Sequence, residues 1–227
     1  MKTESIMKEK EIPGAEERKL PEFNAMQRVK RRFFAMRNGD LAAQMAALGA
    51  AYQINFGLNL PQISEIARDF LPGGTEAQAQ DEGFDYADFA RRLRSNTSTR
   101  ESMLIAPMLF PVESLDAEEA VAWAREVPTA EVADILCMKL LRRYAGAREI
   151  VMTLAQEDMP LRRYTAMRLL LNLLQTGQAD VAFATPLLEA EEKRGCATTA
   201  SVCRQIAQEL GLWRIDQQMP ERLPVMK

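Results

Sequence analysis

Residues 160–174 read PLRRYTAMRLLLNLL, and they predict the strongest helix of the chain. Proline at the first helical position and a run of leucine, methionine and alanine both favour an α-helix. Similar stretches follow one another from Phe23 onward, and turn signals such as Asn38-Gly39 and Gly211 end them. No window shows the alternation of apolar and polar residues that is typical of a β-strand. The chain is therefore predicted to be all-α.

The helices are expected at residues 23–37, 41–52, 61–70, 84–94, 99–110, 116–125, 129–144, 145–156, 160–174, 178–193 and 196–210. Asp40, Asn59 and Thr129 are the expected N-cap residues. Pro61 is expected in a first helical turn, and Pro107 is expected to interrupt its helix. Helices of this length, joined by short turns, favour antiparallel pairs stacked into a curved, concave α-solenoid. The repeat period is not crisp, so an irregular helical bundle is the alternative.

Three regions are expected along the chain. Residues 1–22 are charged and contain two prolines and a glycine, which predicts a tail or a short leading helix, without the apolar segment of a signal peptide. Residues 23–211 form the helical domain, and residues 212–227 form a C-terminal tail. The uncharged stretch 41–64 contains Gln, Asn, Gly and Pro, which indicates two elements and a turn and not a membrane span.

Composition excludes several classes of enzyme. The chain has 227 residues, a formal net charge of −3 and no histidine, so catalytic Ser-His-Asp or Cys-His sets and histidine zinc sites are impossible. Its three cysteines are too few for a thiolate zinc cage or a disulfide scaffold, and they indicate a reducing cytoplasm. The glycine pair at 73–74 does not continue into a phosphate-binding loop. No metal or cofactor is implied.

Paired arginines recur on different predicted helices, at 31–32, 91–92, 142–143 and 162–163. If those helices line one concave wall, the arginines would follow a phosphate backbone, because a guanidinium donates twice to phosphate oxygens. The alternative is a set of solvated helix faces on which glutamates pair with the arginines. The mildly acidic pI of about 5.3 gives no overall attraction to nucleic acid.

Asp134 is the most informative carboxylate because it falls in an otherwise apolar helix, on the same side as Ala130 and Met138. A carboxylate there is either paired with an arginine or used for chemistry, and the alternative is a residue at the boundary of the core that is paired or solvated. A contact between Asp134 and Arg163 across two helices is one hypothesis. The only tryptophans, Trp123 and Trp213, are expected as core or edge anchors, with stacking in a groove as the alternative.

The order of these segments resembles the DNA alkylation repair family, the HEAT-like-repeat alkylpurine DNA glycosylases. The similar segments are Arg32-Phe33-Phe34, Gly57–Ala67, Thr99–Phe110, Trp123, Thr129–Leu141 and Met159–Arg163, within residues 23–211. The resemblance implies HEAT-like helix pairs around a concave groove for duplex DNA. It also implies removal of N3- or N7-alkylated purines without flipping the base, by an aspartate that stabilises the sugar cation and positions water.

Carried over by position, the resemblance places the catalytic acid at Asp134 and the backbone-holding arginine at Arg163. The DNA-binding residues expected beside them are Arg31, Arg32, Arg142, Arg143, Arg162 and Arg168. One groove tryptophan of the family corresponds to Ala130, and the other falls near residues 202–205, where there is none. Tyr144 or Tyr164 is available as a substitute aromatic.

Two functions follow as expectations. The first is a DNA alkylation repair-like protein that binds duplex DNA, with base excision weak, altered or absent because both groove aromatics are missing. The second is a non-catalytic helical-repeat scaffold that binds a protein or peptide in its concave face, which the acidic pI favours. In either case we expect a cytoplasmic monomer with no membrane span.

Overall fold

The computed structural model describes residues 24–49, 52–76 and 83–218, with only the backbone described for residues 212–218. The expected N-terminal tail at 1–22 lies outside these residues. Within them the chain forms α1 (Ala25–Ala35), α2 (Gly39–Ala47), α3 (Leu60–Phe70), α4 (Tyr86–Ser95), α5 (Arg100–Leu109), α6 (Ala117–Arg125), α7 (Ala130–Lys139), α8 (Ala147–Ala155), α9 (Pro160–Gln175), α10 (Val181–Arg194) and α11 (Ala200–Gln218). Short 3-10 turns occur at η2 (Val112–Ser114) and η3 (Leu141–Arg143). The described residues contain no strand, only one isolated bridge between Ile54 and Thr99, so the all-α prediction is confirmed.

Several helix starts follow from their capping residues. The Asn59 side chain accepts a hydrogen bond from the Gln62 N–H, and the Gln62 side chain accepts one from the Asn59 N–H, so α3 begins with the expected cap. Thr129 caps α7 as expected. The prediction for α2 was wrong, because Asn38 and not Asp40 accepts the hydrogen bond of the first turn. Asn38 precedes Gly39, and the helix therefore starts two residues earlier than expected.

One helix interior and two helix ends differ from the sequence expectation. Pro107 lies inside α5 without interrupting it, because the helix is almost wholly buried and loses only one backbone hydrogen bond at the proline. The helix expected at 129–144 stops at Lys139, and a 3-10 turn follows in which Leu140 and Leu141 are both buried. Helix α11 continues through Gly211, since glycine ends a helix when it adopts a left-handed conformation. Gly195 does so, with φ of 62°, and it ends α10.

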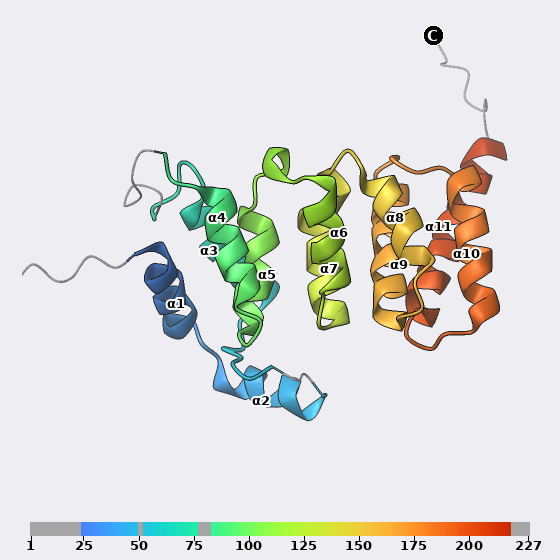
Figure 1. Cartoon of the computed structure of the whole chain (residues 1–227). Coiled ribbons are helices and arrows are strands. Elements are labelled where there is room, and N and C mark those ends of the chain that lie inside the picture. The colour runs from blue at the N-terminus through green and yellow to red at the C-terminus, as the bar shows by residue number, and fades with distance from the viewer. Residues whose placement is uncertain (1–23, 50–51, 77–82, 219–227) are drawn as a thin grey trace, which may run out of the picture.

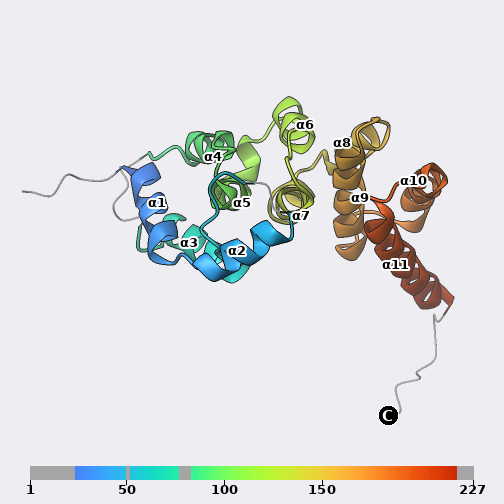
Figure 2. The same ribbon diagram turned by 90° about the horizontal axis from the view of Figure 1, so that it is seen from below.

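The helices from α3 onward lie in two rows that follow chain order (Figures 1 and 2). We call α3, α5, α7, α9 and α11 the front row, because each of these helices contacts the next one in the series. The back row consists of α4, α6, α8 and α10, and it packs on the front row through α4–α5, α8–α9 and α10–α11 contacts. Helix α1 lies at one end of the molecule and α11 at the other (Figure 1).

One continuous apolar core lies between the rows, and it includes Trp123. The Trp123 side chain packs edge-to-face against Phe110 with 5.1 Å between ring centroids, which confirms the expected core role. The Trp213 side chain lies outside the described residues. No helix among the described residues is long and apolar enough to cross a membrane.

A buried carboxylate fixes the chain between α2 and α3. Glu101 is fully buried on α5, and its two oxygens accept hydrogen bonds from the backbone N–H groups of Phe56 and Leu58. The Arg100 guanidinium donates to the same carboxylate at 3.1 Å and to the Leu58 carbonyl at 2.9 Å. The segment before α3 is thereby held against the start of α5.

Candidate functional site

Asp134 lies on the accessible face of α7. Ala130, Asp134 and Met138 follow one another at four-residue spacing and are partly exposed, whereas Ile135 and Leu136 are buried. The Asp134 side chain is 31% exposed. The prediction that Asp134 shares a side of the helix with Ala130 and Met138 is confirmed, and its carboxylate is open to a ligand.

Two side chains of the neighbouring helix α9 hold this carboxylate. The Tyr164 hydroxyl donates a hydrogen bond of 2.8 Å to Asp134 Oδ1. Arg168 Nε lies 3.0 Å from the same oxygen and forms an ion pair with it. Arg168 Nη1 donates to Gln205 Oε1 on α11 at 3.3 Å. These four residues, which we call the Asp134 cluster, join three consecutive helices of the front row.

The surroundings change the proton affinity of Asp134. Burial raises the pKa of the Asp134 carboxyl above its ordinary value, and the charge of Glu131 acts in the same direction. The Tyr164 hydrogen bond and the Arg168 charge act in the opposite direction but do not cancel the effect of burial. Burial and the Asp134 carboxylate together raise the pKa of Tyr164, which therefore stays a hydrogen-bond donor. A carboxylate with a raised pKa is suited to accept a proton from water.

The start of α7 is fixed one turn before Asp134. Arg100 Nε donates to Glu131 Oε2 at 2.9 Å. The Tyr52 hydroxyl lies 3.1 Å from the same oxygen and 2.7 Å from Thr129 Oγ1. Burial, together with Glu131, raises the pKa of Tyr52 to about 12. These contacts occupy Glu131 and hold the helix that carries Asp134.

Arg163 does not contact Asp134, which corrects the hypothesis drawn from the sequence. Its guanidinium Nε bonds to both oxygens of Glu191, at 3.0 and 3.2 Å, and Nη1 donates to the carbonyls of Glu157 and Asp158. One residue along a helix rotates the side chain by about 100°, so Arg163 points away from the face that carries Tyr164. The side chains of Arg163 and Glu191 are 9% and 2% exposed, and the pair is part of the interior.

The other arginines expected at the site are scattered. Arg162 Nη1 donates to Glu157 at 2.7 Å, and Arg125 also pairs with Glu157, so this group is an ion-pair network beside the end of α6. Arg142 and Arg143 lie on η3, beyond the C-terminal end of α7. Arg168 is the expected arginine that lies beside Asp134.

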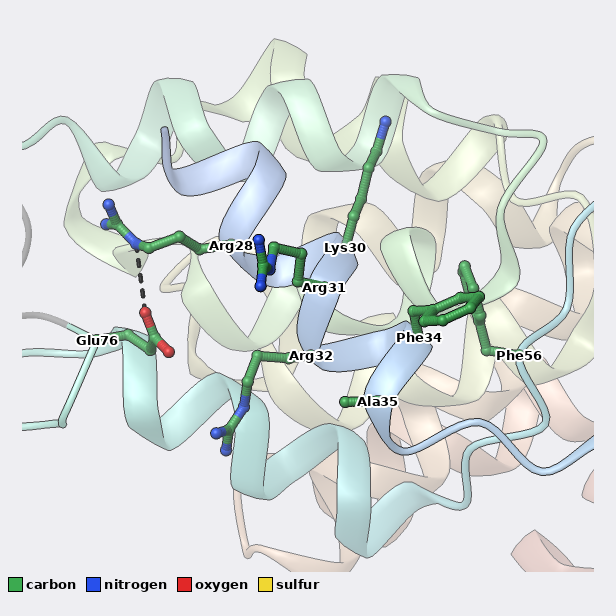
Figure 3. Close-up of a pocket in the computed structure, with 8 residues that line it drawn as sticks. All are labelled: Arg28, Lys30, Arg31, Arg32, Phe34, Ala35, Phe56 and Glu76. Carbon is green, nitrogen blue, oxygen red and sulfur yellow. Dashed lines mark ion pairs between the residues drawn. The ribbon is translucent and has the colours of Figure 1, made fainter. Parts of the chain in front are cut away.

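Arg31 and Arg32 lie on α1, where they line a hollow of about 840 Å³ (Figure 3). Its other lining residues are Arg28, Lys30, Phe34, Ala35, Phe56 and Glu76. Arg28 pairs with Glu76 at 3.3 Å, Arg32 pairs with Asp69, and the Phe34 ring is exposed beneath the Arg37 guanidinium. Helix α1 lies at one end of the molecule, and α5 lies between it and the pair α7 and α9, so this hollow is separate from the Asp134 cluster (Figures 1 and 2).

Sequence reasoning named Asp134 and Arg168 but did not join them, and it left Gln205 without a role. The signal that would have found the cluster is the four-residue spacing of Tyr164 and Arg168, which places both on one face of α9. Within the described residues, no group of acidic and cysteine side chains is arranged to hold a metal ion.

These features define an all-helical protein with a carboxylate, a tyrosine and an arginine held together on one row of helices. The chain belongs to the DNA alkylation repair enzyme family, because a family model of that description matches residues 29–207. The match includes the Asp134 cluster, and it confirms the resemblance seen in the sequence. A search of curated proteins finds no match, and a search of solved structures finds none.

Proposed function

We propose that this protein binds duplex DNA across α7, α9 and α11 and hydrolyses the N-glycosidic bond of N3- or N7-alkylated purines. The observation that carries the proposal is the Asp134 cluster, in which a partly exposed carboxylate is held by a tyrosine and an arginine of the next helix. Membership of the DNA alkylation repair enzyme family supports DNA repair as its setting. A cytoplasmic monomer, as expected from the sequence, belongs to the same proposal.

We also propose that the two rows form a HEAT-like α-solenoid whose front row lines a concave groove. Ion pairs between successive helices support a repeating architecture. Arg91 pairs with Glu119, 28 residues away, and links α4 to α6. Arg100 pairs with Glu131, 31 residues away, and links α5 to α7. Links of this kind recur along both rows, which is the pattern expected where each repeat contacts the next one.

The chemistry follows from the charge of an alkylated purine. The C1′–N bond breaks with its electron pair passing to the cationic base, which leaves as a neutral molecule, and the sugar becomes an oxocarbenium-like cation. Asp134 stabilises this cation electrostatically. Water then adds its oxygen to C1′ and its proton passes to Asp134 Oδ2, which accepts no hydrogen bond from the described residues.

Within this proposal we assign the backbone phosphate next to the reacting sugar to Arg168. Its side chain is 26% exposed, whereas Arg163 is engaged with Glu191 and two carbonyls. Contacts of Arg31, Arg32, Arg142 and Arg143 with more distant phosphates stay predictions. Arg162 is tied to Glu157 and would have to leave that partner to reach DNA.

Release of methylated bases from duplex DNA tests the proposal, with wild type compared with Asp134→Asn. We expect the variant to lose about tenfold or more in rate, which is about 1.4 kcal/mol of transition-state stabilisation. Asp158→Asn is the matched control, because the Asp158 side chain is exposed and outside the cluster. Wild-type protein that releases no base, or an Asp134→Asn variant as active as wild type, would overturn the catalytic proposal.

One observation favours a second candidate, a non-catalytic scaffold that binds a protein or peptide. Ala130 is partly exposed and Gln205 is exposed, at or beside the positions where the family resemblance places its two groove tryptophans. Neither side chain offers an aromatic surface to a sugar cation. Duplex binding at low salt separates the two candidates, since phosphate contacts weaken steeply as salt rises. Salt-sensitive binding that Arg168→Glu reduces supports the DNA protein, and absence of binding at about 50 mM salt favours the scaffold.

A further inference from the structure

Asp134 receives one directed hydrogen bond from the described residues, and Tyr164 donates it. Arg168 Nε is close enough for an ion pair at 3.0 Å, but its N–H makes no hydrogen bond. An ion pair without a directed N–H bond attracts the carboxylate but restrains its rotation weakly. The orientation of the two carboxylate oxygens therefore depends chiefly on the Tyr164 hydroxyl.

The position of the Tyr164 hydroxyl is itself fixed. The ring is half-buried and packs against the apolar core, and its hydroxyl reaches Asp134 on the accessible face of α7. Tyr164 and Arg168 lie one helical turn apart on α9 and reach the same oxygen, Oδ1. This arrangement leaves Oδ2 with no hydrogen-bond partner among the described residues.

We propose that Tyr164 is a positioning residue for Asp134, and that its hydroxyl holds the carboxylate so that Oδ2 faces the reacting sugar. The inference rests on the function proposed above and adds a residue to it. Tyr164 acts through Asp134 and does not itself exchange a proton. A carboxylate free to rotate would present either oxygen, and misplacement of a reacting group by about 1 Å costs about a hundredfold in rate.

The same contact affects the pH dependence of the reaction. The charged and titratable groups around the carboxylate are Glu131 and Cys137 on α7, Tyr164 and Arg168 on α9, and Arg100 on α5 behind Glu131. The Tyr164 hydrogen bond stabilises the ionised carboxylate and so lowers the pKa of Asp134. Removing the hydroxyl raises the pKa of Asp134. A reaction that needs the ionised carboxylate then begins to slow at a higher pH as the solution is acidified.

Tyr164→Phe tests the inference, because it removes the hydroxyl and keeps the ring. Tyr86→Phe is the matched control, since Tyr86 is also partly buried, lies on α4 outside the cluster, and its hydroxyl has no hydrogen bond to the described residues. We expect Tyr164→Phe to lower the single-turnover rate of base release by about ten- to a hundredfold. DNA affinity should stay within about twofold, and the acid limb of the pH–rate profile should move to higher pH. Tyr86→Phe should change neither the rate nor the pH profile.

The outcomes separate this inference from the function on which it rests. An active wild type whose Tyr164→Phe variant keeps its rate and its pH profile overturns the positioning role and leaves the glycosylase proposal in place. A wild type that releases no base overturns the function first. Circular dichroism shows whether Tyr164→Phe is folded. If it is not, Tyr164→Trp takes its place, because it keeps an aromatic ring but has no donor at the position of the Tyr164 hydroxyl, and it should show the same loss of rate.

Discussion

Replacing Arg163 by methionine is expected to destabilise the protein, because the Glu191 carboxylate would stay buried without its main cationic partner. Both side chains are at most 9% exposed, and removing one partner of a buried pair costs about 3–5 kcal/mol. The lower end of this range applies, because Thr199 and Arg194 also bond to Glu191, at 2.7 and 3.3 Å. A loss of about 3 kcal/mol corresponds to a fall of about 6–12 °C in Tm for a domain of this size.

Thermal unfolding followed by far-ultraviolet circular dichroism measures this effect. Arg168→Met is the control, since the Arg168–Asp134 pair is partly exposed and its loss is expected to cost less than about 1 kcal/mol. The double variant Arg163→Met/Glu191→Leu should recover much of the stability, because no unpaired charge stays buried. If Arg163→Met melts within about 2 °C of wild type but loses base release as Arg168→Met does, Arg163 is a groove residue and the assignment to the interior is wrong.

Three further predictions concern the fold and the thiols. Glu101→Gln is expected to lower the free energy of unfolding by about 2–4 kcal/mol, because the new amide N–H₂ group faces a backbone N–H that needs an acceptor. Urea unfolding measures the loss, and Glu65→Gln is the control because Glu65 is exposed. Gly57→Ala is expected to lower the free energy of unfolding by at least about 1 kcal/mol in the same assay, because φ is +71° and a Cβ would lie 2.0 Å from a backbone oxygen. Gly39→Ala is the control, since a Cβ at Gly39 would meet nothing within 4 Å. Cys196 is expected to react with iodoacetamide before the other two cysteines, and mass spectrometry measures the order of labelling. Hydrogen bonds from Thr198 and Thr199 outweigh the effect of burial and lower the pKa of the Cys196 thiol, whereas Cys137 and Cys203 are buried.

Each of these three predictions has a result that would contradict it. Equal urea midpoints for Glu101→Gln and Glu65→Gln would mean that the buried carboxylate does not hold the segment before α3. A Gly57→Ala variant as stable as Gly39→Ala would mean that the segment rearranges at no cost. Even labelling of all three cysteines from pH 6 to pH 9 would contradict a lowered thiol pKa at Cys196.

Much of the fold was predictable from the sequence because its signals are local. The Asn59 cap with Pro61, the Thr129 cap and the leucine-rich run of α9 each act within a turn or two of the helix. Helix ends were less predictable, because tertiary burial decided them. Pro107 is tolerated within a buried helix, and the chain turns at Leu140 so that two adjacent leucines can both be buried.

The candidate site was predictable only in part. Asp134 stood out because a carboxylate within an apolar helix requires an explanation. The choice between Arg163 and Arg168 as its neighbour was not available from the sequence, since it depends on the rotation of α9 against α7. The continuous motif Leu161-Arg162-Arg163 favoured Arg163. The helical period instead places Arg168, five residues later, on the face of α9 that packs against α7.

The arginine pairs show how ion pairs between helices hide, in the sequence, which cations are available to a ligand. Three of these arginines have acidic partners 28 to 37 residues away in the chain, namely Arg91 with Glu119, Arg163 with Glu191 and Arg32 with Asp69, and such pairing is invisible within any one helix. These ion pairs link neighbouring helices and partly neutralise their arginines, and the formal net charge of −3 follows from 32 acidic against 29 basic residues. Attraction to phosphate is then expected from few sites, because an arginine paired with a carboxylate can neutralise a DNA phosphate and release its counterion only by leaving that partner. Under the function proposed above, binding to DNA is therefore expected to depend on geometry at the Asp134 cluster more than on overall charge.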